Sequence, residues 1–397
     1  MTSLLLRNVR PLGGEAVDLL MTDGLIAAIG PALAAPAGTP AEDGAGALLL
    51  PGLVEGHTHL DKTLWGLGWY RNEVGPLLTD KIDNERTYRA ATNHDAGAAS
   101  LAMAKRFLAA GTTAIRSFVD VDTDAGLRHL HGLLDTRAAM APVQRIQVVA
   151  FPQSGILRRP GTDALLDGAM AAGADVVGGL DPCGIDRDPV RHLDIVFGLA
   201  QKHGKPVDIH LHEPGEMGAF SLDLILERTA ALGMRGAVVV SHGFCLGMIE
   251  AAERDALLSR MAAWDLAIAT TAAPSRPVPT VPMCRAARVT LFAGNDGIRD
   301  TWGPYGTPDM LERAMIVGLR SNLRRDEELF WALEAVTGAG ARGCRFAGHG
   351  LAVGDRADLV LVRAETVAEA IVARPTRALV ISAGRVVARE GVLEGWV

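Results

Sequence analysis

Residues 48–62 read LLLPGLVEGHTHLDK and open the central part of the chain. Their apolar run predicts a β-strand over Leu48–Val54, and His57 and His59 follow it with one residue between them. Alternate residues of a strand face the same side, so both imidazoles can point toward one place. We therefore predict a strand whose carboxyl end presents a pair of histidines.

Three later apolar runs end in side chains of the same kind, at His210-Leu211-His212-Glu213, Ser241-His242 and Asn295-Asp296. Imidazole nitrogens and carboxylates suit a divalent ion such as zinc or iron. One His-x-His pair is weak evidence, because histidines at strand ends often only make hydrogen bonds. Four such ends along one chain together predict a metal site. The remaining histidines are interpreted as structural because they fall in helical or loop segments: His94, His129, His131, His192, His203 and His349.

Strand-like runs alternate with helical patterns through the middle of the chain. Helical spacing of apolar residues is seen in segments such as Ala96–Ala110 and Val190–His203. The strand-like runs are Leu48–Val54, Thr113–Val119, Ile146–Phe151, Ala174–Leu180, Val207–Leu211, Ala237–Ser241, Leu266–Thr271 and Val289–Ala293. This alternation predicts a (β/α)8 TIM-type barrel over residues 51–349, with its active site at the carboxyl ends of the strands.

Both ends of the chain have a different texture, with short strand-like runs separated by glycine-containing turns. Residues 31–46 are rich in Gly, Pro and Ala and are expected to form a loop. The predicted short strands are Ser3–Leu6, Ala16–Met21, Leu25–Ile29, Ala357–Val362, Ala378–Ser382 and Arg385–Arg389. We therefore predict one small β-sandwich domain assembled from residues 1–50 and 350–397.

Composition excludes several classes of protein. The 397 residues carry a formal net charge of −7, which argues against a nucleic-acid partner. No run of ~18 apolar residues is present to span a bilayer, and the first residues do not form a signal peptide. The four cysteines lie far apart and form no Cys-x-x-Cys pair, which is typical of free thiols in a reducing compartment. A cytoplasmic protein without a membrane partner is expected.

Five segments resemble the amidohydrolase superfamily and, within it, the cytosine deaminase-like branch. They are PGLVEGHTHLDK at 51–62, VVAFPQSGI at 148–156, GADVVGG at 173–179, DIHLHE at 208–213 and GNDGIRDTW at 294–302. The resemblance implies a hydrolase of carbon–nitrogen bonds other than peptide bonds, with one divalent ion, zinc or iron, as cofactor. It also implies a small heterocyclic substrate and a homo-oligomer.

The same resemblance assigns roles to individual side chains. It implies that the metal is held by His57, His59, His210 and Asp296. His242 would stabilise the attacking hydroxide, Asp296 would accept its proton, and Glu213 would shuttle protons to a ring nitrogen. Either Glu213 or His212 would then protonate the departing amine. The plain alternatives are a surface carboxylate for Glu213 and a structural hydrogen bond for His212.

Three further residues are expected to contact the substrate. Gln153 would hold the carbonyl and ring N–H edge, Trp302 would pack against the ring, and Lys62 would lie beside it. Lys62 could instead be a solvated loop residue, and Trp302 could belong to the core. Arg116, Asp120 and Asp122, near the end of the second barrel strand, are interpreted as scaffold.

The sequence departs from typical cytosine deaminases at three positions. His212 stands before Glu213 where an aspartate is usual, Gly297 replaces a second aspartate after Asp296, and Lys62 follows the first histidine pair. Lys62 and His212 are closer to the N-alkylammelide (triazine) hydrolases of the branch. None of the five lysines lies in Ala174–Leu180, the strand that carries a metal-bridging lysine in binuclear members, which favours a single ion.

Three functions stay open from the sequence. The first is deamination of a cytosine-like pyrimidine or a triazine by a metal-activated hydroxide. The second is release of an alkylamine from an N-alkylamino triazine, or opening of a cyclic amide. The third, a non-catalytic binding protein on the same scaffold, is disfavoured because the predicted metal ligands and Glu213 are all present.

Overall fold

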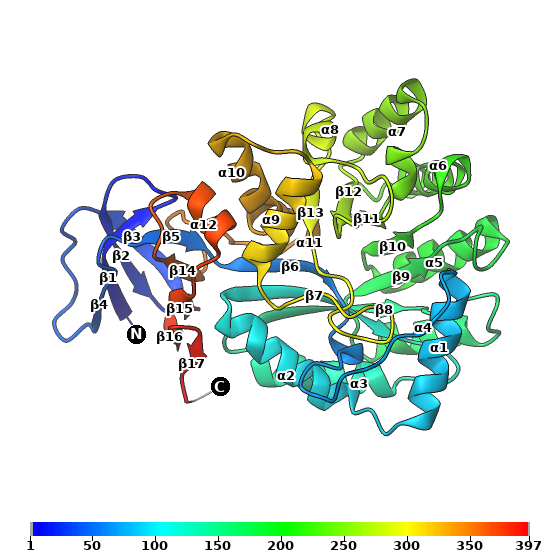
Figure 1. Cartoon of the computed structure of the whole chain (residues 1–397), viewed down its shortest axis with the longest axis horizontal. Coiled ribbons are helices and arrows are strands. Elements are labelled where there is room, and N and C mark those ends of the chain that lie inside the picture. The colour runs from blue at the N-terminus through cyan, green and yellow to red at the C-terminus, as the bar shows by residue number, and fades with distance from the viewer. Residues whose placement is uncertain (1–2, 396–397) are drawn as a thin grey trace.

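The computed structural model describes residues 3–395 and contains a parallel barrel with a smaller domain beside it (Figure 1). The eight strands found for the barrel within these residues pair in sequence order, and every pairing is parallel. They are β6 (Leu53–Thr58), β7 (Thr112–Asp120), β8 (Arg145–Phe151), β9 (Val176–Leu180), β10 (Val207–Leu211), β11 (Val238–His242), β12 (Ala267–Thr270) and β13 (Leu291–Ala293). A parallel bridge between Thr58 and Asp296 joins the first strand to the segment after the last. The predicted TIM-type barrel is confirmed.

Helices cover the outside of the barrel. They are α1 (Leu78–Ala91), α2 (Ala96–Ala109), α3 (Arg128–Met140), α4 (Thr162–Ala171), α5 (Pro189–His203), α6 (Gly215–Ala231), α7 (Ala251–Ala263), α8 (Val281–Ala286), α9 (Met310–Arg320), α10 (Asp326–Ala335) and α11 (Gly338–Cys344), with short 3-10 turns η1 (Leu60–Lys62) and η2 (Phe244–Gly247). Helix α5 shows why these segments fold as they do. Asp188 caps its first turn, Gly204 ends it in the left-handed region, and Leu193, Val196 and Phe197 lie buried on one face. That apolar stripe faces the barrel.

The two ends of the chain build the small β-sandwich domain together, as predicted. Its elements are β1 (Ser3–Pro11), β2 (Val17–Thr22), β3 (Leu25–Gly30), β4 (Ala41–Asp43), β5 (Leu48–Pro51), β14 (Leu359–Val362), α12 (Val367–Ala373), β15 (Arg377–Ser382), β16 (Arg385–Arg389) and β17 (Val392–Leu393). Strand β5 joins the two halves because it pairs with β1 on one side and with β14 on the other. Side chains from both halves, including Leu6, Leu19, Leu361 and Ile381, share one core. The exact limits 1–50, 51–349 and 350–397 stay a proposal.

One predicted strand was wrong in extent. Leu48–Val54 is two strands, because β5 belongs to the terminal domain and β6 to the barrel. The break falls at Gly52, whose backbone N–H donates to Asp358 O at 2.7 Å. A Cβ at this position would lie 2.2 Å from Thr113 Oγ1, so only glycine lets the chain cross here. Residues 31–46, expected to be a loop, contain the short strand β4.

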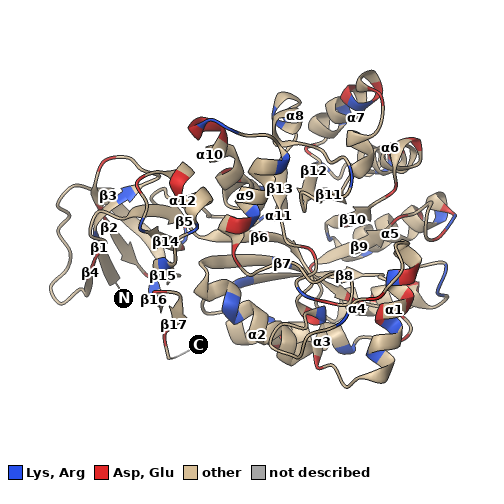
Figure 2. Ribbon diagram, in the orientation of Figure 1, with Lys and Arg blue, Asp and Glu red and all other residues tan. Residues whose placement is uncertain are grey.

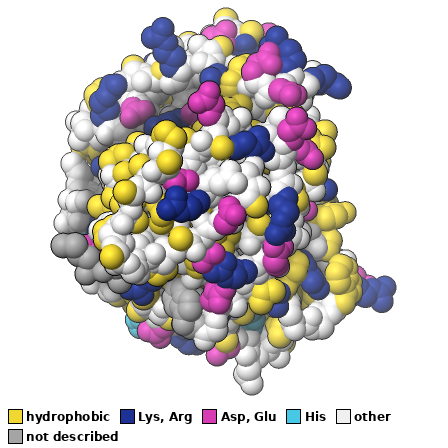
Figure 3. All heavy atoms as spheres, turned by 90° about the vertical axis from the view of Figure 1, so that its left-hand side faces the viewer, with side chains coloured by type: hydrophobic (Ala, Val, Ile, Leu, Met, Phe, Trp, Pro, Cys, Tyr) yellow, Lys and Arg dark blue, Asp and Glu magenta, His cyan; other side chains and the backbone are white. Residues whose placement is uncertain are grey.

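The surface of the terminal domain carries charges of both signs. Figure 3 shows acidic and basic side chains interspersed with apolar ones across this face. None of the helices within residues 3–395 is long and apolar enough to cross a bilayer. All four cysteines are free.

Candidate active site

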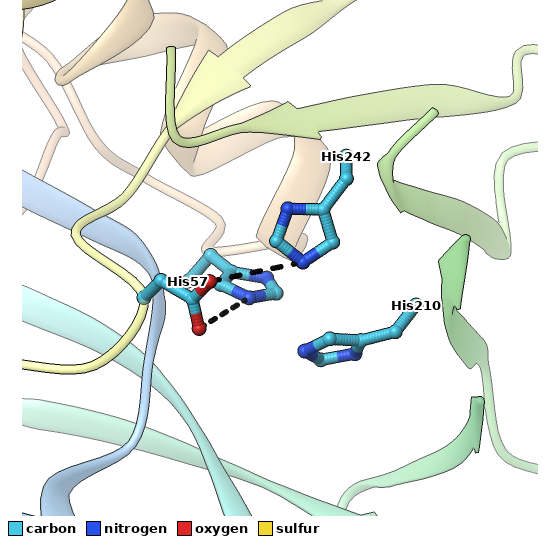
Figure 4. Close-up of side chains that lie close together, drawn as sticks. His57, His210 and His242 are labelled. Atoms are coloured by element: carbon cyan, nitrogen blue, oxygen red, sulfur yellow. Dashed lines mark ion pairs between the residues drawn. The ribbon is translucent and has the colours of Figure 1, made fainter. Parts of the chain in front are cut away.

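Four side chains from different strand ends converge inside the mouth of the barrel. His57, His210, His242 and Asp296 each offer one ligand atom, and these atoms all lie within 4.8 Å of one another. Figure 4 shows the three labelled imidazoles turned toward a common space. His242 and Asp296 have φ values of 71° and 66°, in the left-handed region that is unusual for residues with a side chain. Such backbone strain is concentrated at functional sites.

His59, the other predicted ligand, lies at the edge of this group. Its Nε2 is 3.2 Å from Asp296 Oδ1, while His57 Nε2 is 3.6 Å from the same oxygen. His242 Nε2 is 3.9 Å from Asp296 Oδ2. The structure therefore brings the other three predicted ligands, and His242, around the Asp296 carboxylate.

The ring nitrogens of this group suit a divalent cation. Within the described chain, His57 Nε2 and both ring nitrogens of His210 and His242 are buried and have no hydrogen-bond partner. Leaving a buried polar atom unsatisfied costs about 1–3 kcal/mol, so a cluster of them is unfavourable unless a ligand fills it. A metal ion would satisfy these nitrogens at once, and the donor set fits the cofactor that the sequence predicts.

Electrostatics hold the group in the state that binds metal. Burial and the neighbouring imidazoles, first among them that of His57, lower the pKa of His210 well below its usual value. Burial and the nearby His212 do the same to the pKa of His242. Burial would raise the pKa of Asp296, but the neighbouring His57 and His59 rings hold it well below the ordinary range. Neutral imidazoles and an ionised carboxylate are the forms that coordinate a metal.

A buried hydrogen-bond chain behind His57 fixes the orientation of its ring. Ser241 Oγ donates to Asp208 Oδ1 at 2.6 Å, so it accepts from His57 Nδ1, which lies 2.9 Å away. Asp208 is paired with the Arg116 guanidinium at 2.7 Å. The proton of His57 is thereby placed on Nδ1, and Nε2 keeps its lone pair for a metal. Ser241, visible in the sequence beside His242, belongs to the support of His57.

Replacement of Ser241 by alanine is expected to lower metal affinity about 10- to 100-fold, because the His57 ring loses the partner that fixes its tautomer. Competition with a chromogenic chelator measures the affinity. The matched control is Ser100→Ala, since Ser100 is equally buried but bonds only to Ala96 O inside α2. Equal metal affinity of the two variants would show that the hydrogen bonds behind His57 do not affect metal binding.

Glu55 ties the first and last ligand segments together and was missed by sequence reasoning. Its carboxylate accepts from His57 N at 2.9 Å, from Asn295 N at 3.0 Å and from Asn295 Nδ2 at 2.7 Å. Burial raises the pKa of Glu55 to about 7 despite these bonds. Asn295 in turn accepts from Arg313 Nη2 at 2.8 Å. The signal in the sequence was that Glu55 stands two positions before His57.

A cavity of about 390 Å³ opens beside the converging histidines and Asp296. Its volume is within the range of small-molecule sites. Four of the predicted residues, Lys62, Gln153, His212 and Trp302, line it together with His59, His210, His242 and Asp296. The remaining wall comes from the start of α1, from η2 and from loops, and it includes Leu78, Phe244, Pro274, Arg276, Asp300 and Tyr305. Sequence reasoning did not find these residues.

Lys62 and Gln153 form a buried pair at the cavity wall. Lys62 Nζ donates to Gln153 Oε1 and lies 2.9 Å from Asp120 Oδ1. Burial would lower the pKa of Lys62, but Asp120 and Glu85 raise it, so the ammonium stays charged. Because lysine can only donate, it fixes the amide of Gln153 with the oxygen toward Lys62. The NH2 of Gln153 is then the group left for a ligand. Asp120, interpreted as scaffold, supports this pair directly.

Helix α1 places Glu85 against two of the predicted substrate contacts. Glu85 Oε2 accepts from Trp302 Nε1 and lies 3.4 Å from Lys62 Nζ. Acidic and basic residues alternate along the ribbon of α1 (Figure 2), and Arg89 of this helix pairs with Asp120 and Asp122. The helix is therefore held over the barrel mouth by charge pairs. Glu85 had no sequence signal because it belongs to a polar helix outside the strand pattern.

His212 and Glu213 directly follow β10 and make different contacts. His212 lines the cavity, its Nδ1 is 2.8 Å from Asp181 Oδ2, and its ring stacks on His242 with 4.2 Å between centroids. Glu213 Oε1 accepts from Cys183 N at 2.7 Å and Gly184 N at 2.8 Å, and Oε2 accepts from Ser221. Glu213 is not one of the described residues that line the cavity. The structure thus places one of the two predicted proton carriers in the cavity and the other behind it.

Comparison with known proteins agrees with this geometry. A family profile described as "Amidohydrolase family" matches residues 41–388. The chain is 29% identical to the N-isopropylammelide isopropyl amidohydrolase of Pseudomonas sp. (strain ADP), over 88% of each chain.

Two solved structures share the whole architecture. The N-isopropylammelide isopropylaminohydrolase of Burkholderia multivorans is 61% identical, with a TM-score of 0.97 over 99% of this chain and 100% of that one. The 5-methylcytosine deaminase of Klebsiella pneumoniae, liganded with 5-fluorocytosine, is 27% identical, with a TM-score of 0.86 over 97% of each chain. From these matches and the converging histidines and aspartate we conclude that the chain belongs to the amidohydrolase family, whose members depend on a metal, and that it is a hydrolase of carbon–nitrogen bonds.

Proposed function

We propose that the protein hydrolyses the exocyclic carbon–nitrogen bond of an N-alkylamino hydroxytriazine and releases an alkylamine. The two N-isopropylammelide hydrolases named above support this choice among the functions that the sequence leaves open. The product ring keeps the oxygen of water in place of the alkylamino group. Deamination and alkylamine release are the same bond cleavage with different leaving groups.

One observation carries the choice of an alkylated amine. His212 lies next to Phe244, with 6.0 Å between ring centroids, and both residues line the cavity. The side chain proposed to protonate the departing amine thus has an apolar ring beside it. An alkyl group on that nitrogen would be removed from water against Phe244, whereas an unsubstituted amino group would gain nothing there.

We further propose that one divalent ion, zinc or iron, is held by His57, His59, His210 and Asp296. When bound, the ion supplies Lewis acidity that lowers the pKa of water to about 7. A second group of possible ligands, Asp61, Asp120 and His129, lies nearby. In this second group the charge of Asp120 is already balanced by the Lys62 and Arg89 side chains. One ion therefore fits the charge distribution better than two.

The side chains around the cavity divide the remaining work. The water oxygen bonds to the ring carbon while Asp296 accepts one proton from that water. His242 holds the water oxygen in place. His212 gives a proton to the exocyclic nitrogen as its bond to the ring breaks. Asp181 holds His212 Nδ1, so Nε2 is the nitrogen that transfers the proton.

Two other groups fix the ring. The NH2 of Gln153, held by Lys62, donates to a ring carbonyl, and Trp302 packs against the ring face. A second candidate function is deamination of a cytosine-like pyrimidine, which the likeness to 5-methylcytosine deaminase favours.

A product assay separates the two candidates. Purified protein loaded with zinc or ferrous iron is incubated with N-isopropylammelide, ammelide and cytosine, and isopropylamine and ammonia are measured. We expect isopropylamine release with kcat/KM at least about 10-fold above that for either ammonia-releasing substrate, because one buried alkyl group contributes about 1–3 kcal/mol. Faster release of ammonia from cytosine, with no isopropylamine, would replace the first candidate by the second.

A further inference from the structure

A buried carboxylate occupies the place where residue 297 would carry a side chain. Gly297 follows the metal-site residue Asp296 and lines the cavity. A Cβ built at Gly297 would lie 1.9 Å from Asp300 Oδ2, which no real pair of atoms tolerates. The φ angle of Gly297 lies outside the left-handed region, so its backbone would accept a side chain. A larger residue at position 297 would therefore have to displace the Asp300 carboxylate, and backbone strain is not the obstacle.

The Asp300 carboxylate is held firmly by one oxygen only. Its Oδ1 accepts from Trp302 N at 2.7 Å and from Gly303 N at 3.1 Å. The residue is only 6% exposed, and it lines the cavity together with Trp302. Within residues 3–395, Oδ2 has no hydrogen-bond partner. The backbone bonds thus orient the carboxylate and leave its second oxygen for a ligand.

A carboxylate in this position complements the other polar groups of the cavity. The NH2 of Gln153 is a donor, whereas Asp300 Oδ2 is an acceptor. Within residues 3–395, Asp300 Oδ2 is not among the buried atoms that lack a partner, and the residue lines the cavity, so this oxygen is open to accept an N–H group of a ligand. Rings that carry N–H beside a carbonyl offer both a donor and an acceptor, as hydroxytriazines in their keto form do.

We propose that Asp300 is a substrate-binding residue whose Oδ2 accepts a ring N–H, in the space that the side chain of residue 297 would otherwise fill. The inference rests on the proposed function, because it assigns the recognition of the same heterocycle. It defines the substrate class as rings with an unsubstituted N–H next to a carbonyl. Gly297 departs from the cytosine deaminase pattern, and its lack of a side chain leaves room for the Asp300 carboxylate at this place in the cavity.

Binding of cyanuric acid to the metal-loaded protein tests the proposal, because its ring alternates N–H and carbonyl groups. The central variant is Asp300→Asn, which keeps an oxygen for Trp302 N and Gly303 N but replaces Oδ2 by a donor. Calorimetry should show a Kd raised about 10- to 100-fold with metal content and Tm unchanged. The control is Asp309→Asn at the N-cap of α9, outside the cavity lining, where Asp309 Oδ1 accepts from Leu311 N at 2.9 Å and pairs with Arg377. Its Kd should equal that of the wild type.

Two more measurements decide the outcome. The double variant Gly297→Asp/Asp300→Ala returns a carboxylate to the same space and should bind cyanuric acid more tightly than Asp300→Ala alone. On the wild type, trimethyl isocyanurate, which lacks every ring N–H, should bind at least about 10-fold more weakly than cyanuric acid. Equal binding of the two rings overturns the proposal even if the variants fold poorly.

The proposal and the proposed function fail in different ways. Unchanged cyanuric acid binding in Asp300→Asn, with normal alkylamine release by the wild type, overturns the role of Asp300 alone. A wild type that neither binds cyanuric acid nor releases an alkylamine overturns both.

Discussion

Replacing Asp296 with asparagine is expected to deplete the protein of metal and to lower kcat/KM by about 10³-fold. The carboxylate is the one anionic group among the converging ligands, which otherwise are neutral imidazoles. A buried cation without it loses its charge partner, and the Lewis acidity of the ion is worth several kcal/mol in the transition state. Asparagine has nearly the same shape, and the Asp296 backbone bond to His57 O, at 2.7 Å, does not depend on the side chain.

Elemental analysis after dialysis, together with steady-state kinetics, measures this effect. The control is Asp358→Asn, because Asp358 is a buried aspartate of the terminal domain that bonds to Arg356 and Ser382. That variant is expected to lose stability and to keep its metal. An Asp296→Asn protein that retains wild-type metal content would show that the ion, if bound here, does not need the carboxylate.

Much of this site was predictable because strand periodicity is strict. His57 and His59 share one side of a strand end, as His210 and His212 do, and the order of the strands fixes which ends meet. The split β-domain was predictable from the turn-rich texture of both termini, although the boundary at Gly52 depended on a contact with Thr113 that is remote in sequence.

The groups that sequence reasoning missed act across the fold. Glu85 reaches Lys62 and Trp302 from helix α1, and Phe244 reaches His212 from a short turn after β11. Asp300 fills the space of Gly297 only because the loop folds back on itself. None of these pairs has a fixed spacing or period along the chain, so nothing in the sequence pattern marks them.

Replacement of His212 by asparagine is expected to lower kcat by about 10²- to 10⁴-fold with little change in metal content. General acid catalysis by a positioned side chain contributes this much, and the variant has no group in the place of Nε2. Asparagine keeps an N–H near the position of Nδ1 and can still donate to Asp181 Oδ2, so the local structure is retained. The rate with a trifluoroethylamino substrate should fall less than with an isopropylamino substrate, because a less basic amine leaves without full protonation. A purely structural role of His212 would lower both rates equally.

Glu213→Gln is the variant that tests this assignment from the other side. Glutamine keeps an oxygen for the N–H groups of Cys183 and Gly184, and no cavity-facing atom is lost. We expect kcat to stay within about 10-fold of the wild type, since Glu213 is not among the described residues that line the cavity. The family resemblance gives Glu213 the proton transfer to a ring nitrogen and leaves the departing amine to either Glu213 or His212. A collapse of kcat in Glu213→Gln together with near-normal turnover in His212→Asn would return the proton to Glu213, and would require the 183–184 loop to release that carboxylate when substrate binds.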